Sequence, residues 1–279
     1  MLTAPVRTLG LAERAAVQRL LDRYPIAGAQ VAERVRANGL GRWRAEGRLL
    51  GYGPRRRLEA VCWMGVNVTP IGATAPAVAA FAEEIGGQDR FATSLVGPAD
   101  GVLDLWERLA PAWGPARDVR AAQPLMVTDR PAPVQPDPQV RLVRPDEVDL
   151  LYPASVAMYT EEVGVSPVAD DSDRSYRDRV TELVRTKRSY ARFADGEVVF
   201  KAELAIVTRH TAQVQGVWVT PAWRGRGIAT AAMAAVVADA LRRVAPSVSL
   251  YVNDYNAPAR RVYERCGFRQ VGTFATVLF

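Results

Sequence analysis

Residues 217–229 (VWVTPAWRGRGIA) most constrain what this chain can fold into, because they read as a strand, a glycine-rich turn and a helix in direct succession. Pro221 ends the strand by removing a backbone donor, and Ile228 opens an apolar run of helix-forming residues. Two glycines let the backbone approach a ligand closely, and the first N–H groups of a helix have no intrahelical acceptor. The stretch therefore predicts a phosphate cradle, to which Arg224 and Arg226 add permanent positive charge.

The spacing Arg224-x-x-Gly227-x-Ala229, followed by a second strand and a helix ending in YERCGF, resembles the GNAT family of CoA-dependent N-acetyltransferases. The resemblance implies that this loop binds the CoA pyrophosphate and that the strand before it holds the pantetheine arm through its backbone. Neither G-x-G-x-x-G nor G-K-[ST] is present, which argues against a dinucleotide fold and a nucleotide P-loop. The predicted cofactor-binding residues from the strand to the helix are Val217, Trp218, Val219, Arg224, Gly225, Arg226, Gly227, Ile228, Ala229 and Thr230.

Acyl transfer to an amine needs a donor for the departing thiolate, and a tyrosine hydroxyl keeps its proton at neutral pH. The family places such a tyrosine in a pattern like N-x-x-A-x-x-x-Y, which here is Asn256, Ala259 and Tyr263. The resemblance implies that Tyr263 is the acid and that Asn256 caps its helix and faces the CoA arm. The structural alternative for Tyr263 is a packed core aromatic.

The sequence identifies the general base less clearly than it identifies the general acid. Glu203 lies in the middle of a predicted strand, where a carboxylate is unusual unless it meets a cleft or is paired. Three interpretations stay open: a base, an ion pair with Lys201 on the same face, or a solvated edge position. Glu161 and Glu162 are further acids that would attract a cationic amine, but a solvated helix end is the preferred interpretation of both. Trp218 fits either a core position or a cleft wall.

The pattern of elements predicts an α/β fold with a mixed sheet, in two GNAT-like modules. Helices are expected at 11–23, 27–37 and 76–86, and short strands at 42–47, 49–53 and 57–70. Residues 130–139 (RPAPVQPDPQ) hold four prolines and predict a stiff linker. We therefore expect an N-terminal domain at 1–130, a linker at 131–139 and a catalytic domain at 140–279, closed by strands at 268–272 and 273–279.

The two halves carry short matching motifs in the same order. VNVTP at 66–70 is similar to VWVTP at 217–221, SLVGP is similar to SLYVN, and DLWER is similar to RVYER. In place of the arginine-glycine turn the first half has IGATAP, with Pro76 early and no arginine. We expect a degenerate N-terminal module that does not bind CoA.

Composition excludes several classes of protein. The formal net charge is +6, but 34 of the 36 basic residues are arginines spread along the chain, so we expect no nucleic-acid partner. No apolar run is long enough for a membrane span, and the charged N-terminus does not fit a signal peptide. Cys62 and Cys266 suggest neither a disulfide framework nor a metal site, which is typical of a cytoplasmic protein. The single histidine, His210, falls in a turn and leaves no Ser-His-Asp triad.

Together these observations predict a cytoplasmic N-acetyltransferase that uses acetyl-CoA, needs no metal and acts by direct attack of a primary amine. The amine belongs to a small molecule, a peptide or a protein, and we expect a monomer or a weak homodimer. The alternative is a CoA-binding sensor without turnover. A third hypothesis, a relative of the tandem-module enzyme mycothiol synthase, rests on architecture alone.

Overall fold

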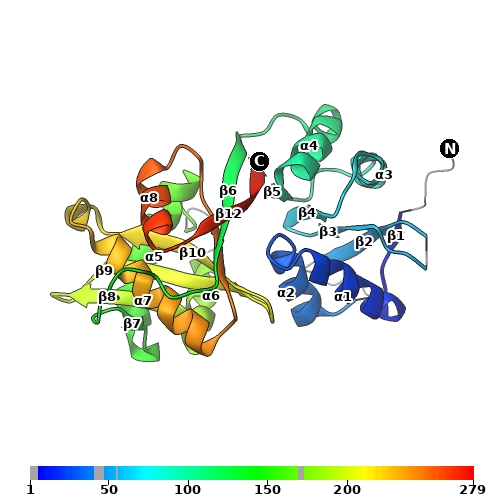
Figure 1. The fold of residues 1–279 in the computed structure, drawn as a ribbon. Coiled ribbons are helices and arrows are strands. Elements are labelled where there is room, and N and C mark those ends of the chain that lie inside the picture. Colours follow the sequence, from blue (N-terminus) through cyan, green and yellow to red (C-terminus); the bar gives the residue numbers. More distant parts are fainter. Residues whose placement is uncertain (1–5, 41–46, 55, 169–172) are drawn as a thin grey trace. The chain divides into compact units, whose positions relative to one another are not determined.

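The structure is a computed structural model that describes residues 6–40, 47–54, 56–168 and 173–279. The strand predicted at 42–47 falls almost entirely outside these residues. The chain forms two compact units, the first made of Met1–Met126, Tyr251–Asn256 and Gln270–Phe279, the second of Val127–Leu250 and Ala257–Arg269. Each unit combines helices with a β-sheet, so the predicted mixed α/β class is confirmed (Figure 1).

The first unit contains a sheet with the strand order β1-β2-β3-β4-β5-β12-β6. Its strands are β1 (Arg7–Thr8), β2 (Arg48–Tyr52), β3 (Ala60–Met64), β4 (Asn67–Ile71), β5 (Ser94–Pro98), β6 (Asp118–Thr128) and β12 (Arg269–Leu278). Its helices are η1 (Leu11–Glu13), α1 (Arg14–Arg23), α2 (Ala29–Asn38), α3 (Ala75–Gly86) and α4 (Ala99–Trp113).

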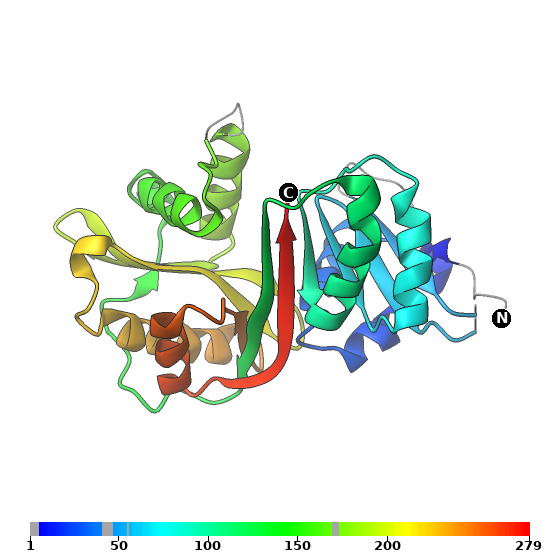
Figure 2. The ribbon, with the colours of Figure 1, turned by 90° about the horizontal axis from the view of Figure 1, so that it is seen from above.

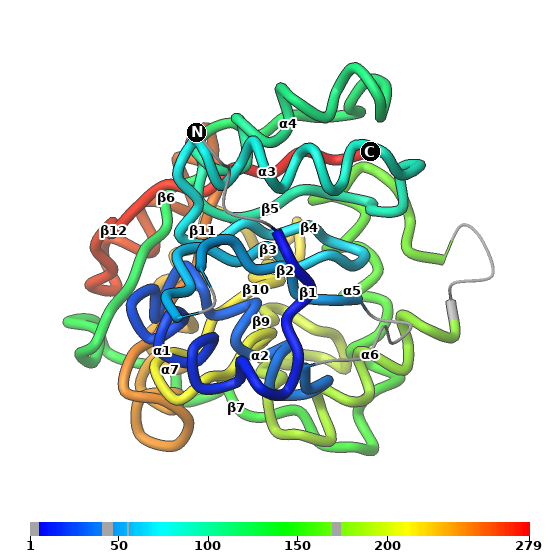
Figure 3. Tube along the Cα trace, turned by 90° about the vertical axis from the view of Figure 1, so that its right-hand side faces the viewer, coloured from blue at the N-terminus to red at the C-terminus, as the bar shows by residue number. Residues whose placement is uncertain are grey.

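Helices cover both faces of strands β2 to β5, which explains why these strands are apolar almost throughout; Figure 3 shows α1 and α2 on one side of them and α3 and α4 on the other. Leu49 and Val61 pack with α1 and α2, whereas their neighbours Leu50 and Cys62 pack with α3 and α4. Successive side chains of a strand point to opposite faces, so a sheet covered on both sides needs apolar residues at every position. The core of this unit thus has two layers.

Strand β12 joins the first unit although it ends the chain. It runs antiparallel to β5, with Phe274 opposite Pro98 and Leu278 opposite Ser94. The two predicted closing strands are one continuous strand (Figure 2), because Gly272 does not adopt the positive φ of a turn. The sequence alone placed these residues with the C-terminal half and did not anticipate the pairing with β5.

The second unit contains the strand order β11-β10-β9-β8-β7. These strands are β7 (Arg141–Leu142), β8 (Ser189–Ala194), β9 (Glu197–Val207), β10 (Ala212–Val219) and β11 (Val248–Tyr251). Helices α5 (Val148–Val163) and α6 (Asp173–Arg185) lie on one face, and α7 (Ile228–Arg243) and α8 (Ala257–Arg265) lie on the other (Figure 2). Short 3-10 helices, η2 (Pro145–Glu147) and η3 (Pro221–Trp223), precede α5 and α7.

The hairpin predicted at Asp195 and Gly196 connects β8 to β9. Both residues have positive φ, 51° and 78°. Two consecutive residues of this kind form the tight turn whose twist matches that of the flanking strands, and Asp-Gly is a preferred sequence for it. The sequence prediction is confirmed here.

The proline-rich segment before β7 has no helix or strand but is fixed to the second unit. The backbone N–H of Asp137 donates to the carbonyl of Ala231 at 2.9 Å, and its carboxylate pairs with Arg192 at 3.0 Å. Both charged side chains are largely buried.

A buried carboxylate holds the start of the second unit together and yields a stability prediction. Glu147 accepts hydrogen bonds from the guanidinium of Arg141 at 2.6 and 2.7 Å and from the N–H of Arg144 at 2.9 Å. The Arg141 hydrogen bond lowers the pKa of Glu147 from 4.5 to about 2. The stability from this shift is present above the ordinary pKa and is lost as the pH falls from about 4.5 towards 2, because the folded state must then bind a proton that it resists.

Glu147→Gln is expected to lower the free energy of unfolding by about 2 kcal/mol near neutral pH, a difference that shrinks as the pH falls towards about 3. Denaturant unfolding over this pH range checks it. Asp146→Asn is the matched control, because the Asp146 side chain is 73% exposed and its Arg144 partner 60% exposed. Such an exposed pair contributes about 0.5 kcal/mol or less. Equal effects of the two variants at all pH values would contradict the assignment.

Candidate functional site

Strand β10 departs from regular pairing in the middle of the second unit. Its parallel pairing with β11 ends at Gln213, whereas its antiparallel pairing with β9 continues to Val219. A register shift between Gln215 and Trp218 takes Gly216, with φ +58°, out of the ladder. The edge of β10 beyond Gln213 therefore keeps backbone donors and acceptors for a ligand. Sequence reasoning passed over Gly216, although an isolated glycine in a strand pattern indicates a bulge.

The turn after β10 has the form expected of an anion cradle. It passes through η3 and then through Gly225 and Gly227, with φ +75° and +76°, directly into α7. A Cβ added at either glycine would meet no atom within 4 Å, so the space in front of the turn is open. The N–H groups of Ile228 and Ala229 lie in the first turn of α7 and have no intrahelical acceptor.

The two arginines of the turn have different surroundings. Arg224 donates to the carbonyl of Val219 at 2.9 Å and to the carboxylate of Glu161 at 2.7 Å, so its charge is already paired. Arg226 lies over the ring of Trp223 at 5.0 Å, is exposed, and has no carboxylate partner among the described residues. Arg224 thus holds the turn against α5, while Arg226 is available to bind an anionic ligand.

Trp218 is half-buried and forms part of a cavity wall. Its indole N–H donates to Glu161 at 3.0 Å, and the guanidinium of Arg224 lies 6.0 Å from its ring. The Arg224 hydrogen bond, followed by that of Trp218, lowers the pKa of Glu161. Glu161 therefore links the end of α5 to the turn, while its side chain stays 52% exposed, as predicted for a solvated helix end.

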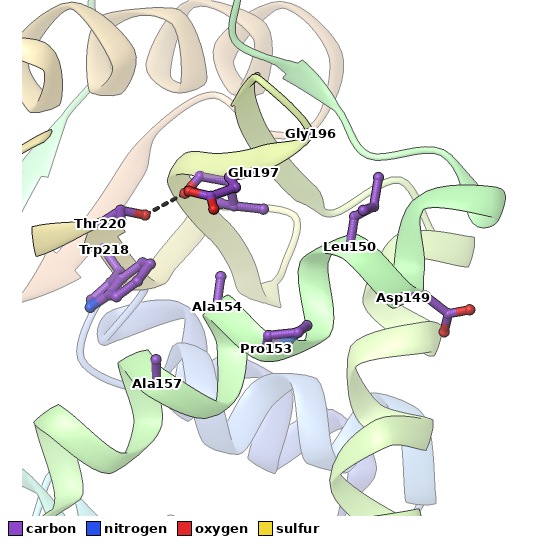
Figure 4. Close-up of a pocket in the computed structure, with 10 residues that line it drawn as sticks. Asp149, Leu150, Pro153, Ala154, Ala157, Gly196, Glu197, Trp218 and Thr220 are labelled. Atoms are coloured by element: carbon purple, nitrogen blue, oxygen red, sulfur yellow. Dashed lines mark hydrogen bonds between the residues drawn. The ribbon is translucent and has the colours of Figure 1, made fainter. Parts of the chain in front are cut away.

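The cavity beside Trp218 has a volume of about 390 Å³ and lies between α5 and the β8–β9 hairpin (Figure 4). The hydroxyl of Thr220, at the end of β10, donates to the carbonyl of Val198 next to it. The lining residues are Asp149, Leu150, Pro153, Ala154, Ala157, Gly196, Glu197, Val198, Trp218 and Thr220.

Tyr263 lies on α8 with its ring packed against Phe268, at 5.9 Å between centroids, and with 7% of its surface exposed. Its hydroxyl makes no hydrogen bond with the described residues. Burial raises the pKa of this hydroxyl, and the charge of Glu162 raises it further. The group therefore stays protonated at neutral pH, with its donor uncommitted. Ring packing and a role as an acid are both compatible with this position.

Glu203 and Lys201 form a buried ion pair on the α5 and α6 side of β9. The Nζ atom of Lys201 lies 3.2 Å from one carboxylate oxygen of Glu203, and Arg179 lies 3.7 Å from the other. Lys201 is fully buried and Glu203 is 8% exposed. The predicted ion pair is therefore present, and the solvated edge position is excluded. Sequence reasoning missed Arg179, because α6 carries several arginines without a distinguishing pattern.

Two further residues that were predicted to bind the cofactor are Thr230, in the first turn of α7, and Asn256, directly before α8. The N–H of Thr230 reaches the carbonyl of Gly227 at 3.3 Å, and the carbonyl of Thr230 accepts from the thiol of Cys266 at 3.4 Å. Asn256 is exposed and directly precedes α8, and its N–H donates to the carbonyl of Asn253 at 2.9 Å. Its contact with a CoA arm stays a prediction.

The corresponding turn of the first unit is built differently. Residues 72–74 link β4 to α3, whereas residues 220–227 link β10 to α7. A Cβ at Gly72 would lie 3.0 Å from the ring of Tyr24, and Pro76 removes one donor from the first turn of α3. The motifs VNVTP and VWVTP lie on corresponding strands, because β4 and β10 each pair antiparallel with the strand before them and parallel with the strand after them. They differ in detail, since Pro70 lies inside β4 and Pro221 follows β10.

The described residues contain neither a metal-binding cluster nor a helix that could span a membrane. No group of three or more histidine, cysteine, aspartate or glutamate side chains is placed to hold a metal ion. None of the described helices combines the length and apolar character needed to cross a membrane.

The comparisons with known proteins agree with this geometry. Residues 151–268 match the family model described as "Acetyltransferase (GNAT) family", and residues 47–151 match the one described as "Domain of unknown function (DUF4081)". No curated protein matches the chain in sequence.

Several solved structures share the fold along almost the whole chain. A GCN5-related N-acetyltransferase from Sphaerobacter thermophilus is 18% identical, with a TM-score of 0.60, over 98% of this chain and 94% of that one. A tandem GNAT protein from the clavulanic acid biosynthesis pathway is 15% identical, with a TM-score of 0.56, over 98% and 97%. A Drosophila protein is 13% identical, with a TM-score of 0.68, over 99% of both chains.

Proposed function

We propose that the domain of the GNAT acetyltransferase family carried by residues 151–268 transfers an acetyl group from acetyl-CoA to a primary amine. The observation that carries this proposal is the run of β10, the open turn with Gly225 and Gly227, and α7. An open backbone at a helix N-terminus, with one uncommitted arginine, fits a pyrophosphate and is not needed by a neutral ligand.

The residues around β10 fit the parts of CoA. The N–H groups at the start of α7 and the guanidinium of Arg226 would hold the pyrophosphate. The unpaired edge of β10 from Val217 to Val219 would hold the pantetheine amides through backbone hydrogen bonds. Bound acetyl-CoA supplies an acyl group activated as a thioester. The two proton transfers of the reaction are carried out by side chains of the protein.

In this proposal Tyr263 donates a proton to the departing sulfur, because its hydroxyl is protonated and makes no hydrogen bond to the part of the chain that the structure describes. Glu203 accepts a proton from the amine, directly or through water. Cys266 is unsuited to a covalent route, since burial raises the pKa of its thiol to about 11 and its Sγ already contacts the Thr230 carbonyl. The amine therefore attacks the acyl carbon directly.

One observation favours the alternative of a CoA-binding sensor. Both oxygens of Glu203 face a cation, so the carboxylate is already engaged in ion pairs. The two functions separate when CoA affinity is measured by calorimetry and thiol release from acetyl-CoA is measured with and without amines. An enzyme gives amine-dependent thiol, and a sensor gives binding alone. We further infer a cytoplasmic protein from two cysteines that are both buried and free.

One CoA per chain is expected in a calorimetric titration. The first unit lacks the open turn, and Tyr24 occupies the space next to Gly72. Tyr24→Ala serves as the control, because clearing that space should add no second site while Pro76 and the short 72–74 link remain. Two equivalent sites in the wild-type protein would contradict the proposal for the first unit.

A further inference from the structure

The charged side chains that cluster below the bulge of β10 do not balance. Lys201 is fully buried, and a charged lysine in that position must be compensated. Glu203 supplies one negative charge for two cations, Lys201 and Arg179. Within the described ranges, no other carboxylate lies within 4.0 Å of either cation. The cluster of these three residues therefore carries one excess positive charge.

Other polar groups facing this cluster add no negative charge. The hydroxyl of Tyr176 donates to the carbonyl of Ser155 at 2.9 Å. Burial, and after it the charge of Glu203, raises the pKa of Tyr176, so the phenol stays neutral. Tyr159 contacts the same ring, at 5.4 Å between centroids. These two tyrosines therefore do not compensate the excess positive charge of the cluster.

The cluster directly adjoins the bulge at which an acyl group would react. A Cβ at Gly216 would lie 3.0 Å from the Nζ atom of Lys201 and 3.2 Å from the carboxyl carbon of Glu203. Glycine at this position therefore leaves the charged pair within reach of the β10 edge. The exposed fraction of the side chain increases from 0% for Lys201 through 11% for Glu203 to 52% for Arg179.

From these observations we propose that the acceptor carries a carboxylate close to its amine, as an amino acid does. Arg179, exposed and 3.7 Å from Glu203, receives the carboxylate, while Glu203 receives the amine deeper in the site. The charge of Lys201 favours the neutral, nucleophilic form of that amine. A cationic polyamine or a lysine in a basic segment meets an excess of like charge here. This inference rests on the proposed function.

The test compares two matched pools of acceptors with acetyl-CoA, namely L-amino acids and the corresponding L-amino-acid amides. Thiol release is measured for the wild type and for Arg179→Gln. Arg177→Gln is the control, because Arg177 lies on the same helix but pairs with Asp149. Amides have the less basic amines, so intrinsic reactivity near neutral pH favours the amide pool and works against the expected result.

The wild type is expected to use the acid pool at least tenfold better in kcat/KM. Arg179→Gln should lose about 10- to 100-fold with the acids and less than about twofold with the amides. Arg177→Gln should keep the preference. Equal use of both pools by the wild type, or an equal loss with both pools in Arg179→Gln, would overturn this inference. Absence of CoA binding, or CoA binding without any amine-dependent thiol, would instead overturn the proposed function.

Discussion

Replacing Tyr263 by phenylalanine is expected to lower kcat by about 10²- to 10⁴-fold while leaving CoA affinity nearly unchanged. The substitution removes one hydroxyl, which makes no hydrogen bond with the described residues, and it keeps the ring that packs against Phe268. The lost interaction therefore belongs mainly to the transition state. The loss of stability should be about 1 kcal/mol or less, since no buried partner is stranded.

Turnover with generic amines, CoA affinity and melting temperature together decide this prediction. A structural role for Tyr263 leaves all three close to wild type, whereas a role as the acid changes turnover alone. Tyr190→Phe is a useful control, because the Tyr190 hydroxyl donates to Asp239 at 2.8 Å in a network outside the candidate site. That variant should lose stability and keep kcat. Wild-type turnover of Tyr263→Phe would leave the acid unassigned.

Replacing Gly227 by valine is expected to weaken CoA binding by more than about tenfold, which corresponds to about 1.4 kcal/mol. Gly227 has φ +76°, which a β-branched residue adopts only with strain. The new side chain would also occupy the open space through which an anion reaches the first N–H groups of α7.

Gly114→Val controls for backbone strain. Gly114 has φ +75°, open space around an added Cβ, and a place at the C-terminus of α4 in the first unit. Both variants should lower the melting temperature by a similar amount, and only Gly227→Val should weaken CoA binding. Calorimetry that gave the two variants equal affinities would place the ligand elsewhere.

The local features of the fold could be predicted from the sequence because they depend on neighbouring residues. Asp195 and Gly196 specify a tight hairpin by their conformational preferences, and Gly225 and Gly227 mark a turn with open backbone. The pairing of β12 with β5 joins residues far apart in the chain. The paired segments, 274–278 of β12 and 94–98 of β5, are largely buried and apolar, so their patterns suit several neighbours equally well, and no local signal selects one.

The sequence predicts which residues form the turn of the candidate site, but it does not predict which of their charges are paired. The sequence places Arg224 and Arg226 together, but only the structure shows that Arg224 is paired with Glu161. Glu161 lies on α5, 63 positions away in the sequence, so periodicity carries no sign of that contact. The pair of Glu203 with Lys201 was foreseeable from their spacing on one strand face, whereas the approach of Arg179 from α6 was not.

The rate at which free thiol appears from acetyl-CoA, measured with and without a broad pool of amines, decides whether this protein is an acetyltransferase. We expect thiol release that depends on amine, exceeds hydrolysis of the thioester and matches the acetylated amine mole for mole. Saturable CoA binding to one site per chain, with no amine-dependent thiol from small amines, amino acids or peptides, would contradict an acetyltransferase and identify a CoA-binding sensor.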